Sequence, residues 1–168
     1  MRLGVGGWAL LAVLVAGCAP KHARQGRRIE GRYLTGQPGE GWVHVKPGGA
    51  DQAWFHQGLD ASLYTDSNCG PRFQEGRPEK LMQQLLAGLY SVEVIEAGPH
   101  AVGRRTGEIR VERATLDGVP VQVGAVVINR GACTYDFVYI APPARFAAGW
   151  EGFERVLAGF EPAGGDLD

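Results

Sequence analysis

The sequence predicts an α+β domain, with a mostly antiparallel sheet of about six strands and two packing helices. Three observations carry this prediction: β-rich runs form two groups, an amphipathic helix separates them, and a second helical stripe follows. Strands in runs favour a layered α+β architecture over alternating parallel units. The chain has 168 residues, 45% hydrophobic and 21% charged, so it can bury one core and is not a disordered protein.

The first group holds three short strands, predicted at 42–45, 53–56 and 61–65, where aromatic and β-branched residues cluster. Turn residues separate them, with Pro47-Gly48-Gly49 after the first strand. The third strand is followed by Asp66, Asn68 and Gly70. Short strands joined by turns predict an antiparallel meander.

A helix is predicted from Pro78 to about Ser91. Pro78 suits a first-turn position, and Glu79 suits the positive end of the helix dipole. Apolar residues recur at helical spacing along one face: Leu81, Met82, Leu85, Leu86 and Leu89. This stripe predicts that the helix docks on the sheet by one side.

The second group holds three further strands. Residues 108–112 alternate with period two, and Asp117-Gly118 is a hairpin signal before a long strand at 119–127. One face of that strand is marked by small apolar residues: Val119, Val121, Val123, Ala125 and Val127. The last strand covers 134–140 and stops at Pro142-Pro143.

The chain closes with a second helical stripe, formed by Phe146, Trp150, Phe153, Leu157 and Phe160. Gly149, Gly152 and Gly159 weaken its intrinsic helix propensity. We expect one domain at 41–162 with the order strand-strand-strand-helix-strand-strand-strand-helix, and a frayed tail at 163–168.

The N-terminus predicts export. Arg2 precedes an apolar run, Leu3 to Ala16, that is shorter than the roughly 20 residues a membrane span needs. The run ends in Val15-Ala16-Gly17-Cys18, which resembles the bacterial lipobox. The resemblance implies a signal peptide at 1–17, cleavage between Gly17 and Cys18, and lipid on the Cys18 sulfur and amino group. The alternative is an ordinary signal peptide that happens to contain a cysteine.

Several acyl chains on Cys18 would anchor the protein firmly to a membrane. Ala19, rather than aspartate, follows the cysteine, which in enteric bacteria implies sorting to the outer membrane. Residues 18–40 then form a flexible, basic tether, because they hold few large apolar groups and many glycines. The basic residues of this segment are Lys21, Arg24, Arg27, Arg28 and Arg32.

Two cysteines, Cys69 and Cys133, remain once Cys18 carries lipid. In an oxidising compartment they predict a disulfide, which would stabilise the fold by about 4 kcal/mol in the chain-entropy model. A bridge requires Cα atoms within about 7 Å of each other, which follows naturally if the third and sixth predicted strands are antiparallel neighbours. The alternatives are two buried free thiols, or a zinc site, for which the sequence lacks CxxC or HxxxH spacing.

The predicted order of strands and helices over roughly residues 41 to 162 resembles that of the PsbP-like α/β/α sandwich family. The stretch Cys133 to Pro143, followed by Arg145-Phe146, is also similar to uncharacterised lipoproteins of deltaproteobacteria. The resemblance is topological and implies a fold; it carries over no catalytic residue.

Motifs for catalysis, cofactors and metals are absent from the sequence: there is no GxSxG elbow and no phosphate-binding loop. His44 and His56 could meet on neighbouring strands, but two ligands rarely hold a metal. Asp136 lies inside an aromatic strand, where we expect it to face solvent or to bond backbone. The pairs Glu108/Glu112 and Glu151/Glu154 are expected on solvated faces.

Aromatic residues are abundant for a small domain: Trp42, Trp54, Phe55, Tyr64, Trp150 and Phe153. We expect core packing for most of them, and an apolar ligand-binding cleft between sheet and helix is the alternative.

The net charge of −1 gives no basic field, so nucleic acid is not an expected partner. We therefore expect a lipid-anchored envelope protein that is not an enzyme: a binding or accessory module of a transport or assembly system. Its partner would be an envelope protein or an apolar ligand, with no cofactor. A small envelope hydrolase with an unfamiliar site is the alternative.

Overall fold

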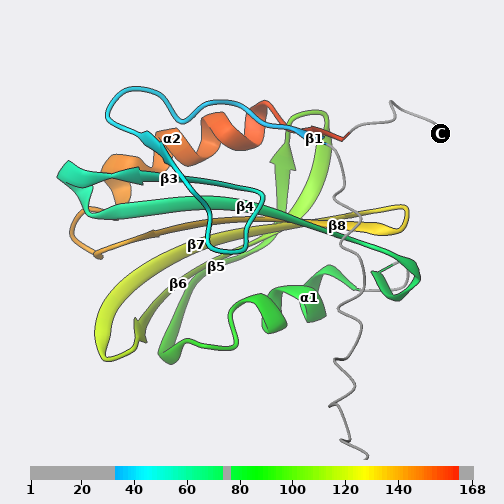
Figure 1. The fold of residues 1–168 in the computed structure, drawn as a ribbon. Coiled ribbons are helices and arrows are strands. Elements are labelled where there is room, and N and C mark those ends of the chain that lie inside the picture. Colours follow the sequence, from blue (N-terminus) through cyan, green and yellow to red (C-terminus); the bar gives the residue numbers. More distant parts are fainter. Residues whose placement is uncertain (1–32, 74–76, 163–168) are drawn as a thin grey trace, which may run out of the picture.

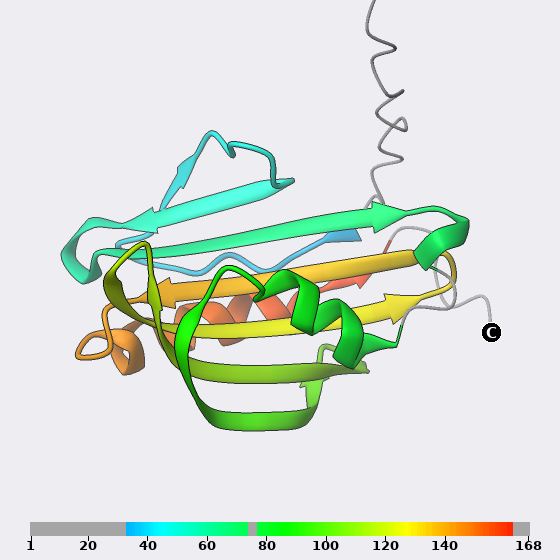
Figure 2. The same ribbon diagram turned by 90° about the horizontal axis from the view of Figure 1, so that it is seen from below.

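The structure, a computed structural model, describes residues 33–73 and 77–162. Within these ranges seven strands form one antiparallel sheet with a helix on each face, as Figures 1 and 2 show from two directions. Across the sheet the strands are β2 (Val43–Val45), β3 (Gln52–His56), β4 (Ala61–Cys69), β8 (Cys133–Ala141), β7 (Val119–Arg130), β6 (Arg105–Leu116) and β5 (Tyr90–Val102). The predicted α+β class is confirmed.

The two predicted groups of strands meet at the centre of the sheet. Strand β4 pairs with β8 in antiparallel register, from Ser62 opposite Ile140 to Cys69 opposite Cys133. This confirms the predicted pairing of the third and sixth strands. We call the β4–β8 pair the seam, since it joins the meander β2–β3–β4 to the meander β5–β6–β7–β8.

Helix α2 (Phe146–Ala158) covers one face of the sheet (Figure 1). The core beneath it is aromatic: Phe137 and Tyr139 of β8 are fully buried together with Phe153 of α2. The helix contains Gly149 and Gly152 because its backbone packs closely against aromatic side chains at these positions. A Cβ at Gly149 would collide with the Tyr139 hydroxyl, and one at Gly152 would lie 2.7 Å from Nε1 of Trp42. The glycines that weaken helix propensity therefore permit close packing.

Helix α1 (Pro78–Leu85) covers the opposite face (Figure 2). Met82 is buried against the predicted apolar face of β7, formed by Val121, Val123, Ala125 and Val127. The helix ends at Leu85, earlier than the predicted Ser91. Leu86 and Leu89 still pack on the same cluster, but from the turn that leads into β5. The apolar stripe was therefore recognised correctly, and its last members lie outside the helix.

Strand β5 is the seventh strand, and the sequence did not predict it. Residues 90–97 are exposed on both sides of the sheet, so burial imposes no alternating pattern there. Two register shifts interrupt its pairing with β6, and the strand contains Pro99. Proline is compatible with this position because β5 is an edge strand.

The folded part begins before the predicted boundary at residue 41. Tyr33–Leu34 forms β1, which pairs with β9 (Glu161–Pro162), and the Gly36 amide donates to the Val156 carbonyl at 3.1 Å. Tyr33 packs on the aromatic core, which supplies the apolar contact that residues 19–40 were expected to lack. The tether prediction for 33–40 is thus wrong, whereas residues 1–32 and the tail at 163–168 lie outside the described residues.

Candidate functional site

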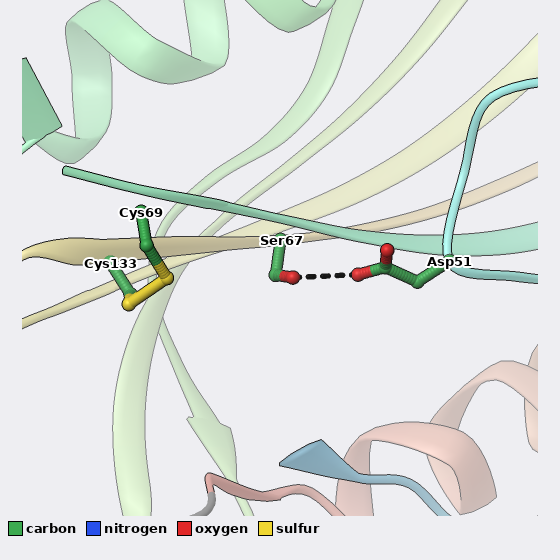
Figure 3. The surroundings of a disulfide bond; sticks show 4 residues. All are labelled: Asp51, Ser67, Cys69 and Cys133. Atoms are coloured by element: carbon green, nitrogen blue, oxygen red, sulfur yellow. Dashed lines mark hydrogen bonds between the residues drawn. A yellow bond between two sulfur atoms is a disulfide. The ribbon is translucent and has the colours of Figure 1, made fainter. Parts of the chain in front are cut away.

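A disulfide joins Cys69 to Cys133 across the seam (Figure 3). The two residues lie directly opposite each other, with Cα atoms 4.0 Å apart. The bridge lies where the two meanders meet, and it links the end of β4 to the start of β8. Of the three interpretations of this cysteine pair, the structure contains the disulfide.

Polar contacts near the bridge fix loops to the α2 side of the sheet. The buried Ser67 hydroxyl donates to the Asp51 carboxylate at 2.6 Å (Figure 3). Tyr33 and Thr65 share a hydrogen bond of 2.7 Å between their hydroxyls. Burial raises the pKa of Tyr33 well above its ordinary value, so this phenol stays neutral. These contacts hold the N-terminal segment and the β2–β3 turn in place.

The opposite side of the seam carries two facing carboxyl groups. Asp66 of β4 lies directly opposite Asp136 of β8. Burial, with a smaller contribution from the Asp66 charge, raises the pKa of Asp136 to about 7. Alternation along β8 turns Asp136 toward the side of the sheet that carries α1, where its side chain is half-buried.

Both histidines of the first meander contact neighbouring groups of the protein. His44 lies edge-on to the Trp54 ring, with centroids 5.6 Å apart. His56 accepts a hydrogen bond from the Leu59 amide through Nδ1, at 3.2 Å, and so caps the short 3₁₀ helix η1 (Gln57–Leu59). In the described ranges, no three His, Cys, Asp or Glu residues gather in a way that could hold a metal ion.

The two glutamate pairs differ in environment. Glu151 and Glu154 lie on the outer side of α2, as expected, where Glu154 contacts His100 at 3.4 Å. Glu112 is buried instead, and its Oε1 lies 2.7 Å from Nε of Arg110. Its predicted solvated position is wrong, because α1 covers this face of β6 and the arginine on the same face offsets the buried charge.

Most of the aromatic residues pack in the core. Trp54 and Phe153 are buried, Trp42 and Trp150 pack against them, and Tyr64 packs on the α1 side. These rings line neither of two hollows found among the described residues. One, of about 240 Å³, lies between the β5–β6 turn and the end of α2. The other, of about 220 Å³, lies between α1 and strands β5 and β6 and is lined partly by Glu108 and Arg110.

The free edge of β5 is the most apolar exposed strand edge among the described residues. Four large side chains there are between 45% and 68% exposed: Tyr90, Val92, Val94 and Ile95. Strand β5 pairs with β6 on one side only, so backbone groups on its other side face outward. We call residues 90–97 the β5 edge; no sequence pattern indicated it, since the strand itself was missed.

The predicted lipidation residue Cys18 and the cleavage position at Gly17 lie outside the described residues. Among the helices that the structure describes, none is long and apolar enough to cross a membrane.

No protein-family model and no curated protein sequence matches the chain. Several solved structures share its fold. LpqN of Mycobacterium tuberculosis, described as involved in cell envelope biogenesis, has a TM-score of 0.59 at 11% identity. That match covers 83% of this chain and 87% of LpqN.

The cyanobacterial PsbP protein (CyanoP) of Synechocystis sp. PCC 6803 has a TM-score of 0.53 at 15% identity, covering 86% of this chain and 99% of that one. A Bacteroides thetaiotaomicron protein has a TM-score of 0.54 at 10% identity over 80% of this chain, which spans about half of that protein's length (49%). At such identities the likeness concerns the fold, and the predicted PsbP-like fold is confirmed.

Proposed function

We propose that this protein is a lipid-anchored, non-catalytic accessory module of the cell envelope, and that a partner protein adds an extended segment to the β5 edge. The observation that carries the proposal is the exposed apolar side chains of that edge beside unpaired backbone. An added strand would satisfy the backbone groups by hydrogen bonding and cover the apolar side chains.

The charges on β5 favour a partner over a second copy of this chain. Glu93 and Glu96 lie on the exposed strand, and Glu93 is only 3.5 Å from Arg113 of β6. Pairing β5 with its own copy would bring glutamates of both chains together, which is unfavourable across strands. A segment with neutral or basic side chains fits this edge better.

The anchor part of the proposal is supported by the lipobox-like run that ends at Cys18. The fold is compatible with an envelope role, since LpqN shares it and is described as involved in cell envelope biogenesis. With Tyr33 already in the fold, residues 19–32 separate Cys18 from the domain. The domain would then lie near the membrane surface, where its partner is also expected.

A photo-crosslinking amino acid at Val94, in the full chain expressed in its own host, tests the edge. Val43 is the matched control, because it is a similarly exposed valine on β2, at the opposite edge of the sheet. We expect a discrete adduct with one envelope protein at Val94 and not at Val43. The crosslink should map to an extended segment, and an added Ile95→Asp substitution should reduce it.

Equal adducts at both positions, adducts with a second copy of this chain, or no adduct at Val94 would contradict the proposed partner at the β5 edge.

A panel of hydrolase substrates, applied to the purified protein, tests the proposal that the protein is non-catalytic. Turnover of any substrate class above that of buffer would favour the hydrolase alternative.

A further inference from the structure

A polar group of side chains lies on the α1-facing side of the seam. Asp66 is opposite Asp136, and in the next row Asn68 is opposite Thr134. These residues share a face with Val138, which packs in the α1-side cluster. Helix α1 lies over β6 and β7, so the group sits beside the helix rather than beneath it. Its place in the sheet is independent of the lipid anchor and of the β5 edge.

Thr134 gives this group an unusual feature. Its side chain is 2% exposed, and its Oγ1 has no hydrogen-bond partner among the described residues. A buried hydroxyl without a partner loses about 1–3 kcal/mol of solvation, so such atoms commonly indicate an ion or a water that completes them. Thr134 is two residues from Asp136 on β8, which turns its hydroxyl toward the same side.

Asp136 makes no ion pair with any described residue, and its side chain is half-buried. Its carboxyl group lies opposite that of Asp66, whose Oδ2 accepts a hydrogen bond from Nδ2 of Asn68 at 3.3 Å. Two facing carboxyl groups therefore create a negative potential on this side of the seam. A positive ion between them would lower their mutual repulsion.

We propose that Asp66, Asp136 and Thr134 bind one hard divalent cation, Ca²⁺ or Mg²⁺, at the seam. Residues directly opposite on antiparallel strands have Cβ atoms about 5 Å apart, so both carboxylates can reach one ion. Thr134 is about 6.7 Å along the strand from Asp136, within reach of a shared ligand sphere. All three side chains offer oxygen, the ligand atom that these cations prefer. Both aspartates are half-buried, so water can complete the coordination.

Thermal unfolding of the purified full chain tests the site. The protein is stripped with EDTA and then measured in about 10 mM CaCl₂, in MgCl₂, and in KCl of equal ionic strength. Oxygen-ligand sites with few charges bind Ca²⁺ with dissociation constants of about 10⁻⁴ to 10⁻³ M. We therefore expect one of the divalent salts to raise Tm by about 3 to 10 °C above the KCl value.

The variants Asp136→Asn and Asp66→Asn should lose this increase, and Thr134→Val should reduce it. The control is Asp117→Asn, which removes an exposed carboxylate at a distant hairpin turn and should keep it. A comparison of Ca²⁺ with Mg²⁺ identifies the preferred ion. The proposal is overturned if neither divalent salt exceeds KCl, or if the increase persists unchanged in both aspartate variants.

Discussion

At Asp136, burial and a like charge on the neighbouring strand act in the same direction. The pKa of this carboxyl is raised from 3.8 to about 7, with Asp66 and Tyr64 of β4 as its titratable neighbours. Between these two values the folded protein holds a proton that the unfolded chain has released. The free energy of unfolding therefore falls as the pH rises from about 4 to about 7, by at most on the order of 4 kcal/mol.

Urea unfolding in EDTA across this pH range measures that slope. Asp136→Asn should flatten it, because the amide does not titrate, and should make the protein more stable than the wild type at pH 8. A slope that is unchanged in the variant would show that other groups cause it. The sequence identified Asp136 as the acid to inspect, but its environment depends on Asp66, which only the register of the two strands places opposite it.

At the scale of the elements, the disulfide links two strands that are far apart in the sequence. Replacing both Cys69 and Cys133 with alanine should lower the free energy of unfolding by about 4 kcal/mol, because the unfolded chain then regains its loop entropy. Non-reducing peptide mapping should show one linked pair in the wild-type protein. Recovery of both cysteines as free thiols from the protein isolated without reductant would contradict the structure at the seam.

Elements with a buried face were predictable from the sequence, and the others were not. On strand β7, Val121, Val123, Ala125 and Val127 mark the face that packs with Met82 of α1. Strand β5 lacks such a cover over residues 90–97, so its side chains follow no period. The β5 edge therefore could not be predicted, since the exposure that makes it a candidate site also removes the pattern.

Considered as one domain, the protein has the α/β/α layering that the PsbP-like resemblance implied and the central join that the cysteine pair predicted. The predicted start of the domain is too late, because Tyr33 is a single aromatic residue in a basic, glycine-containing segment. Its packing against Tyr135, with ring centroids 5.4 Å apart, and its bond to Thr65 are long-range contacts without a local signal. In the sequence, residues 19–32, rather than 19–40, separate Cys18 from the first described strand.

Membrane attachment through Cys18 is predicted from the lipobox-like run, and one substitution tests it directly. Cys18→Ser should remove the lipid, because serine lacks the thiol that carries it. Fractionation of the native host, with detergent-free washing of the membranes, then compares the variant with the wild type. We predict that the wild-type protein stays with the membranes and the variant moves to the soluble periplasmic fraction. A Cys18→Ser protein that remains membrane-bound through the washes would contradict the claim.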